Sequence, residues 1–214
     1  WIRSSGAQMF RSTGDIQDNW FSIKSIVDSQ LSHQPYGGSY CHNDMDMLVV
    51  GMHGNSDNAE VVDGDKGGCS DVEYKTHFAL WAIMNSPLII GCDIRRMSDN
   101  TKEILMNKDI IAINQDTECR GPYCIKQWNN PDNVFALIKP LEGGDYAIGM
   151  FNLSDNRSEM SLQFYDIGLP ATAGRALKLY DCYSHSEDGV YEDRYATYIE
   201  PHDCRMFRAR VVKL

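Results

Sequence analysis

HFALWAIMNSPLIIG, from His77 to Gly91, carries the strongest structural signal in this chain. Its first half is apolar on nearly all sides of a helix that we predict from about Val72 to Asn85, so this helix must be largely buried. Its second half, PLIIG, is a short continuous apolar run, which is typical of a strand in a parallel sheet covered on both faces. A buried helix followed by a buried strand predicts a layered α/β domain.

This stretch contains the helix of a second strand-helix unit and the strand of a third, and a first unit precedes it. The first combines a strand at Ala7 to Phe10 with a helix from about Gln17 to Ser32, whose apolar residues recur at helical spacing. The second leads from a strand within Gly38 to Asp44 to the buried helix. After PLIIG, Ser98 is placed to cap the next helix. Three consecutive βα units predict an α/β barrel or a doubly wound sheet.

From about Thr117 the pattern changes to alternating β-branched and aromatic segments, separated by Gly, Asp and Asn turns about every ten residues. This is the pattern of a small antiparallel sandwich. The sequence therefore predicts two domains, an α/β domain over residues 1–116 and an all-β domain over residues 117–214. HGNSDNAEVVDGDKGG, from His53 to Gly68, is rich in Asp, Asn and Gly, and we expect it to be an exposed insertion.

Composition restricts the partners. The 214 residues carry a formal net charge of −10 at pH 7 without a cluster of Lys and Arg, so nucleic acid would be repelled on average. Apolar runs such as MLVVGM are far shorter than the ~20 residues that cross a bilayer, which predicts a soluble protein, secreted or cytoplasmic, without a membrane partner. The opening residues, WIRSSG, are typical of the inside of a longer chain, so we expect a fragment or a processed product.

The seven cysteines are an odd number, so at least one thiol is unpaired. They lack the Cys-x-x-Cys pairs that are typical of zinc sites. Cys119 and Cys124, in CRGPYC, would close a small disulfide loop in an oxidising compartment or remain two free thiols. Both states are compatible with the sequence, and the compartment stays open.

Charged residues follow the C-terminal ends of the three predicted strands, where barrel enzymes and open α/β sheets build their sites. A carboxylate held near an arginine at this edge of a sheet is suited to general acid/base catalysis. In chain order, the charged residues are Arg11 and Asp15, Asp44 and Asp46, and Asp93 and Arg95.

Most of these residues also have a structural alternative. Asp15 is placed to cap the helix that follows it, which is the commoner role of an Asp before a helix. In NDMD, Asn43 and Asp44 would bond to backbone in a turn, and Asp93 and Arg95 would form a structural pair. Taken alone, the residues indicate an α/β enzyme with an acidic site and leave these alternatives open.

Longer segments resemble a known family. They are MFRSTGDIQDNWFSI, NDMDMLVVG, GGCSDVEYKTHFALWAIMNSPLIIGCDIRRMS and NKDIIAINQD, which cover most of residues 7–116. In this order they resemble the C-terminal half of glycoside hydrolase family 27, the α-galactosidases and α-N-acetylgalactosaminidases. The resemblance implies about the last three βα units of a (β/α)8 barrel followed by an antiparallel β-sandwich domain. It also implies a hydrolase that needs neither a metal nor an organic cofactor.

The same resemblance implies roles for individual residues. Asp15 would be the general acid/base of a retaining mechanism, and Arg11 would contact the sugar and the catalytic carboxylate. Asp46 and Met47 would line the sugar pocket, whereas Asp44 would be a buried structural partner. The family's nucleophile lies in a Lys-Tyr-Asp segment, which this sequence does not contain.

His42 and Met45 stand where the family usually has Trp and Pro, and the insertion before Gly67 is longer than usual, so the rim of the pocket is expected to differ. We predict a retaining glycosidase that releases terminal α-linked galactose or N-acetylgalactosamine, in a chain that lacks the nucleophile and is inactive without the missing N-terminal half of the barrel. The sequence decides neither the sugar nor the oligomeric state. The alternative is a non-catalytic fragment whose β domain binds carbohydrate or a protein partner.

Overall fold

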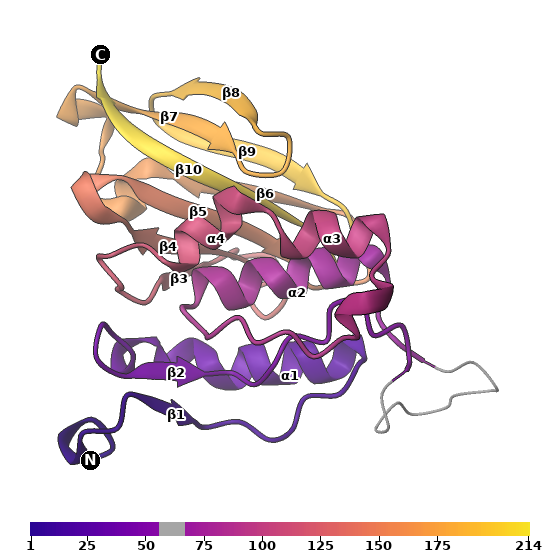
Figure 1. Cartoon of the computed structure of the whole chain (residues 1–214). Coiled ribbons are helices and arrows are strands. Elements are labelled where there is room, and N and C mark those ends of the chain that lie inside the picture. Colours follow the sequence, from indigo (N-terminus) through magenta and orange to yellow (C-terminus); the bar gives the residue numbers. More distant parts are fainter. Residues whose placement is uncertain (56–66) are drawn as a thin grey trace.

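The computed structural model describes residues 1–55 and 67–214. Its first part combines two short strands with four α-helices (Figure 1). These elements are β1 (Met9–Arg11), α1 (Trp20–Gln30), β2 (His42–Asp44), α2 (Asp71–Ile83), α3 (Asp99–Leu105) and α4 (Lys108–Asn114). Residues 56–66 of the predicted insertion lie outside the described residues.

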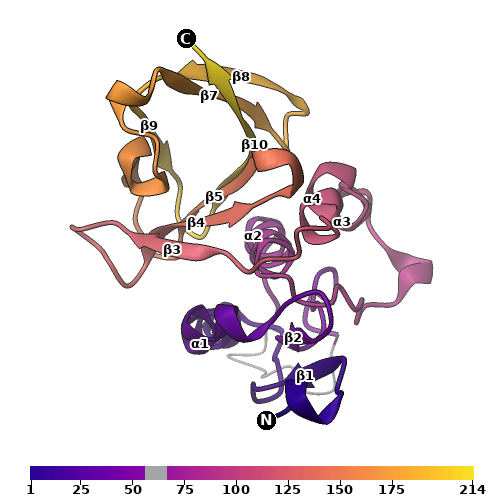
Figure 2. The same ribbon diagram turned by 90° about the vertical axis from the view of Figure 1, so that its left-hand side faces the viewer.

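The second part is built from antiparallel strands. Six of them form one sheet in the order β3-β4-β5-β10-β7-β8, and β6 pairs with β9 in a second sheet. Figure 2 shows β9 across the sandwich from β5 and β10. The strands are β3 (Tyr123–Lys126), β4 (Val134–Pro140), β5 (Tyr146–Asn152), β6 (Ser158–Gln163), β7 (Arg175–Asp181), β8 (Ser186–Tyr191), β9 (Arg194–Ile199) and β10 (Cys204–Lys213).

The β4 strand joins two hydrophobic cores because alternate side chains point to opposite faces of a sheet. Val134, Ala136 and Ile138 belong to the core inside the sandwich. Phe135 and Leu137 belong instead to the core that contains the helices of the first part. Both faces of this central strand are therefore covered within the chain.

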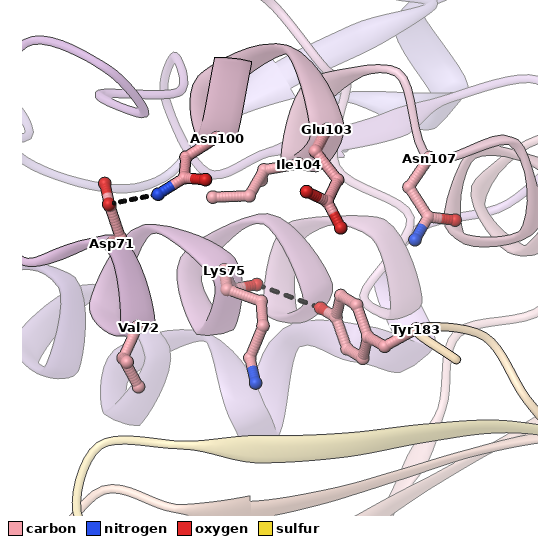
Figure 3. A pocket seen from close by; sticks show the side chains of 8 residues that line it. All are labelled: Asp71, Val72, Lys75, Asn100, Glu103, Ile104, Asn107 and Tyr183. Carbon is pink, nitrogen blue, oxygen red and sulfur yellow. Dashed lines mark hydrogen bonds between the residues drawn. The ribbon is translucent and has the colours of Figure 1, made fainter. Parts of the chain in front are cut away.

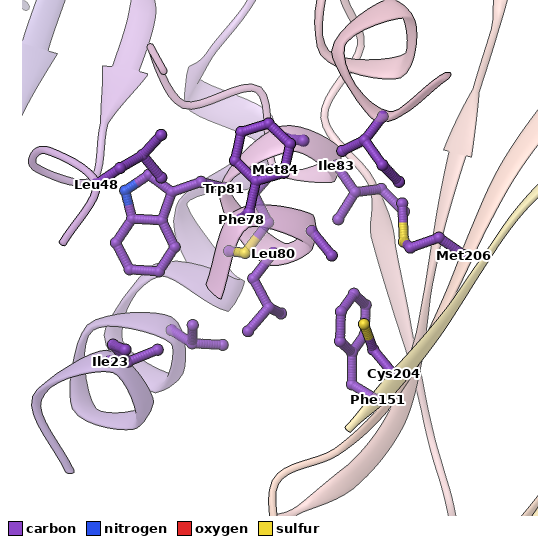
Figure 4. Close-up of a cluster of buried hydrophobic side chains, with 14 of the residues drawn as sticks. Ile23, Leu48, Phe78, Leu80, Trp81, Ile83, Met84, Phe151, Cys204 and Met206 are labelled. Carbon is purple, nitrogen blue, oxygen red and sulfur yellow. The ribbon is translucent and has the colours of Figure 1, made fainter. Parts of the chain in front are cut away.

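Helix α2 confirms the prediction of a buried helix near Val72 to Asn85. It begins with a capping box, in which the Ser70 side chain accepts from the backbone N–H of Glu73 and the Glu73 side chain accepts from the backbone N–H of Ser70. Its apolar side chains pack towards α1 on one side and towards β5 and β10 on the other (Figure 4). Burying each large side chain of this kind stabilises the fold by about 1.5–3 kcal/mol.

The prediction that PLIIG forms a strand covered on both faces is wrong. Only an isolated parallel bridge joins Ile90 to Leu48 in the described part of the chain. Ile89 and Ile90 are 48% and 44% exposed. Within the described residues, the bridge to this segment consists of two backbone hydrogen bonds made by Leu48, so a continuous ladder does not form.

The first helix is shorter than its apolar spacing indicates. We predicted a start near Gln17, but α1 begins at Trp20 because Asn19 is the N-cap and accepts from the backbone N–H of Ser22. The preceding strands β1 and β2 are parallel, with Met9 opposite His42. Ser98 caps α3, as predicted.

All seven cysteines are free, so no disulfide joins Cys119 to Cys124. Across residues 1–55 and 67–214, no helix combines the length and the apolar character that a membrane crossing requires.

His77 is a fully buried histidine in α2. Its Nε2 accepts from the backbone N–H of Val49 at 3.2 Å, and its ring meets Trp81 edge-on with the ring centroids 4.1 Å apart. Burial lowers the pKa of His77 to about 3, from the ordinary value of 6.5. The folded protein therefore keeps this ring neutral over a range in which the unfolded chain protonates it.

This difference predicts acid sensitivity. Between pH 6.5 and about 3 the unfolded chain binds one proton more at His77, so the free energy of unfolding falls as the pH falls, by up to about 1.4 kcal/mol per pH unit from this group. Urea unfolding at pH 7, 6, 5 and 4 measures the slope. The His77→Gln variant keeps an acceptor for the Val49 N–H but should lose the contribution of His77 to this pH dependence. Equal slopes of unfolding free energy against pH in both proteins would contradict the prediction.

Candidate active site

Arg11 brings two carboxylates together at the end of β1. Its Nη2 lies 2.6 Å from Oδ1 of Asp15 and 2.9 Å from Oδ2 of Asp46. The parallel register of β1 and β2 places Arg11 opposite Asp44, so the chain segments after both strands meet at the same edge. Three residues named from the sequence as site candidates are thus direct neighbours.

Asp46 is the most tightly held member of this group. Its backbone has φ +80°, a left-handed conformation that Asp adopts more readily than most residues. Oδ2 also accepts from the N–H of Ile16 at 2.7 Å, and Oδ1 accepts from the N–H of Met47 at 2.7 Å. The indole Nε1 of Trp81 donates to the Asp46 carbonyl at 2.8 Å. These bonds fix the carboxylate that holds Arg11.

Trp81 was not named as a site residue from the sequence. It is fully buried in α2, and its pattern signals only a core residue. The structure shows that its polar tip supports the strained turn at Asp46. A buried tryptophan usually finds a hydrogen-bond partner, but no sequence spacing indicates which one.

Asp15 does not cap α1, so the structural alternative considered for it is wrong. Asn19 performs that role. The side chain of Asp15 is 86% exposed, and Arg11 is its hydrogen-bond partner within residues 1–55 and 67–214. Its second oxygen is therefore open to a ligand or to solvent.

Asp44 has the structural position expected for it. Its side chain is nearly buried, and Oδ1 accepts from the backbone N–H of Asp46 at 2.9 Å. Met47 is half-buried and leans over Gly91, where an added Cβ would lie 2.8 Å from the Met47 sulfur. Its side chain thus rests on the PLIIG segment.

The end of the third predicted strand does not join the Arg11 group. Arg95 instead forms a bidentate pair with Asp93, with Nε 2.8 Å from Oδ1 and Nη2 2.9 Å from Oδ2. The hydrogen bonds from Arg95 lower the pKa of Asp93. This geometry matches the structural pair that we considered from the sequence.

Among the hollows of the described residues, two are relevant to these elements. Asp15 lines the first, of about 390 Å³, together with hydroxyl-bearing residues of its own loop and of α1. The second, of about 220 Å³, lies between α2, α3 and the turn after β7 (Figure 3). Asp71 and Asn100 bond to each other across its mouth at 2.7 Å, and the Tyr183 hydroxyl donates to the Lys75 carbonyl at 3.1 Å. Two pairs among its lining residues are thus already bonded to each other.

His42, His53 and His77 lie on different segments. Within the described residues, no group of three or more His, Cys, Asp or Glu side chains is arranged to hold a metal ion.

Comparison with known proteins places the chain in a family. The family model described as "Alpha galactosidase A" matches residues 2–116, and the model of the α-galactosidase C-terminal β-sandwich domain matches residues 132–209. The chain belongs to the α-galactosidase family. This confirms the resemblance to glycoside hydrolase family 27 and the fold class, a part of a (β/α)8 barrel followed by an antiparallel β-sandwich.

Individual α-galactosidases match over two thirds to nearly all of the chain. The enzyme of Cyamopsis tetragonoloba is 35% identical over 97% of this chain and 46% of its own length. Human α-galactosidase A is 38% identical over 67% of this chain and 30% of its own length. A solved putative α-galactosidase of Bacteroides fragilis superposes with a TM-score of 0.85 at 31% identity, over 98% of this chain and 44% of that one.

The chain therefore spans about half the length of the curated α-galactosidases that it matches. These relatives are glycoside hydrolases, and the α-galactosidase fold of this chain places Arg11, Asp15 and Asp46 at the edge where its two parallel strands end.

Proposed function

We propose that the complete protein to which this chain belongs is a retaining glycosidase that releases terminal α-linked galactose or N-acetylgalactosamine. The observation that carries the proposal is the contact of Arg11 with both Asp15 and Asp46, in a chain whose relatives are named α-galactosidases. Arg11, Asp46 and Met47 would bind the sugar, and Asp15 would perform acid/base catalysis.

Asp15 suits a role in both chemical steps. Protonated, it would donate to the glycosidic oxygen as the bond to the anomeric carbon breaks. As a carboxylate, it would then take a proton from the water that hydrolyses the covalent intermediate. Its exposure leaves room for a leaving group, and its bond to Arg11 limits the positions that its side chain adopts.

The nucleophile is not among the carboxylates near Arg11. Retention needs a second carboxylate about 5–5.5 Å from the acid/base and free to attack. Both oxygens of Asp46 are already occupied, by Met47 on one side and by Ile16 and Arg11 on the other. Asp44 is nearly buried, and Asp93 is bound by Arg95. We therefore propose that none of these three is the nucleophile and, because the family's Lys-Tyr-Asp segment is absent from this sequence, that the nucleophile lies outside this chain.

The open edge of the first part supports a missing partner segment. Met9, Ile89 and Ile90 are between 44% and 50% exposed, although each lies on or beside the small parallel sheet. An apolar sheet edge of this kind is normally covered or paired. We propose that the N-terminal half of the barrel covers it and completes the sugar pocket.

We also propose the boundary at residues 116 and 117 between the two domains. The last helix ends at Asn114 and the first strand of the sandwich begins at Tyr123. Both faces of strand β4 are buried, which favours a structural role for the β domain over the alternative of a free carbohydrate-binding face.

The product of the complete enzyme tests this function. With nitrophenyl α-galactoside and nitrophenyl α-N-acetylgalactosaminide as substrates, we expect turnover of at least one, and proton NMR should show the α-anomer of the sugar first. Nitrophenyl α-glucoside is the matched control. First appearance of the β-anomer, or no turnover of either substrate, would contradict the proposal.

A further inference from the structure

Asp18 is a buried carboxylate close in sequence to Asp15. Its residue is 2% exposed, and within residues 1–55 and 67–214 it makes no ion pair with a cation. Three neutral donors reach it instead. The backbone N–H of Gly54 lies 2.8 Å from Oδ2, the backbone N–H of Cys69 lies 3.3 Å from Oδ1, and the Tyr74 hydroxyl lies 2.8 Å from Oδ1.

Burial of the Asp18 carboxylate destabilises the fold unless these three hydrogen bonds are kept. A buried carboxylate without a cation loses its hydration, and only hydrogen bonds from the protein replace it. The Tyr74 hydroxyl also accepts from the backbone N–H of His53 at 2.7 Å, so it is aligned to donate to Asp18. Burial and the hydrogen bond to the Asp18 carboxylate raise the pKa of Tyr74. Asp18 is thus tied to the start of α2 and to the turn at Gly54.

The segment from Asp15 to α1 has few other hydrogen bonds to the rest of the fold, although the Ile16 side chain is buried in the core. Between Asp15 and α1 the chain forms no regular element. The Ile16 N–H donates to Asp46, and the Gln17 N–H donates to the Ser22 side chain at 2.9 Å. The bond to Ser22 lies within the loop and the first turn of α1. Between Asp15 and α1, Asp46 and Asp18 therefore supply the hydrogen bonds to elements other than α1. Before Asp15, Ser12 also bonds to Gln30 of α1.

We infer that Asp18 is a positioning residue for the acid/base: by binding Gly54, Cys69 and Tyr74 it holds the loop so that Asp15 stays within reach of Arg11 and of the leaving oxygen. The inference rests on the proposed role of Asp15. It assigns a function to a residue that touches neither the substrate nor Arg11.

The test compares kinetics in the complete enzyme. In Asp18→Asn an amide NH₂ replaces one oxygen and faces a backbone N–H that needs an acceptor. We expect kcat to fall by about 10- to 100-fold with KM nearly unchanged, because small displacements of a catalytic group have effects of this size. Tyr74→Phe removes one donor and should cause a smaller loss in the same direction. If Asp18→Asn does not fold, Tyr74→Phe serves as the test variant in its place.

Asp181→Asn is the matched control. Asp181 is similarly buried but binds Arg205 in the β domain, far along the chain from the loop. After correction for the folded fraction, we expect its kcat to equal that of the wild type. If Asp181→Asn lowers kcat as much as Asp18→Asn does, the loss reflects general stability and the inference is overturned.

Hydrogen exchange separates positioning from local support. If Asp18 has only a local structural role, the Asp18→Asn variant should lose exchange protection only at the backbone amides of its partners Gly54 and Cys69. Positioning predicts that the Ile16 amide, bonded to Asp46, also exchanges faster in Asp18→Asn. Unchanged protection at Ile16 overturns the inference.

The Asp15→Asn variant distinguishes a failure of the inference about Asp18 from a failure of the proposed function. If Asp15→Asn abolishes turnover while Asp18→Asn keeps the wild-type kcat, the function stands and the inference fails. If Asp15→Asn keeps full turnover, the proposed function fails, and the exchange rate at Ile16 still shows whether Asp18 anchors the loop.

Discussion

Replacing Asp15 by Asn in the complete enzyme is expected to lower kcat for nitrophenyl α-galactoside by about 10²- to 10⁴-fold, the usual contribution of a general acid or base. Asn has the same shape and still accepts a hydrogen bond from Arg11, whose Nη2 lies 2.6 Å from the Asp15 carboxylate. It cannot release a proton to the leaving oxygen or take one from water. Initial rates at saturating substrate measure the effect.

The leaving group sharpens this test. An α-galactosyl fluoride needs little protonation as it leaves, so its first step should be less impaired in Asp15→Asn than that of an unactivated galactoside. Asp93→Asn is the control, because Asp93 also follows a predicted strand but binds Arg95 instead of Arg11. Its turnover should match the wild type. An undiminished rate in Asp15→Asn would remove Asp15 from the mechanism.

Truncating Trp81 should produce the largest change in stability. We expect Trp81→Ala to lower the free energy of unfolding by about 3–5 kcal/mol, because the ring is fully buried and its loss leaves a cavity. It also leaves the carbonyl of Asp46 without its donor. Since a domain of this size has only about 5–15 kcal/mol of net stability, the shift in urea midpoint should be large.

Two variants separate the causes of this loss. Trp81→Phe fills most of the volume but removes the N–H that binds Asp46, so it should cost about 1–3 kcal/mol. Phe21→Ala changes an aromatic residue that is 82% exposed, and it should stay within about 0.5 kcal/mol of the wild type. An equal midpoint shift for Trp81→Ala and Phe21→Ala would contradict the core role of Trp81.

The sequence predicts well those elements whose own residue pattern determines which of their faces are buried. Helix α2 is apolar on nearly every side, so any fold of the chain had to bury it, and the structure does. Strand β4 lies in the region where the sequence predicts antiparallel strands, and its side chains alternate between the two faces, as a period of two requires. These features depend on local spacing and need no knowledge of distant residues.

The failures share a different cause. PLIIG has the composition of a buried strand, yet only Leu48 pairs with it, and burial depends on what the rest of the fold brings alongside. Asp15 precedes a helix, as a cap does, but Asn19 is better placed relative to the first turn. In both cases the local structure depends on a neighbouring residue or segment that composition does not identify.

From residue pattern and family resemblance, the sequence predicted the fold class, most of the order of elements and the charged residues that follow the predicted strands. Only the tertiary structure determines which of those charged residues are in contact. Arg11 joins Asp15 and Asp46 and excludes Asp93, and Asp18 binds partners as distant in the chain as Tyr74. The reason is physical: periodicity reports which face of an element is apolar, whereas hydrogen bonds and ion pairs depend on distances of a few ångströms that arise only after distant segments have packed.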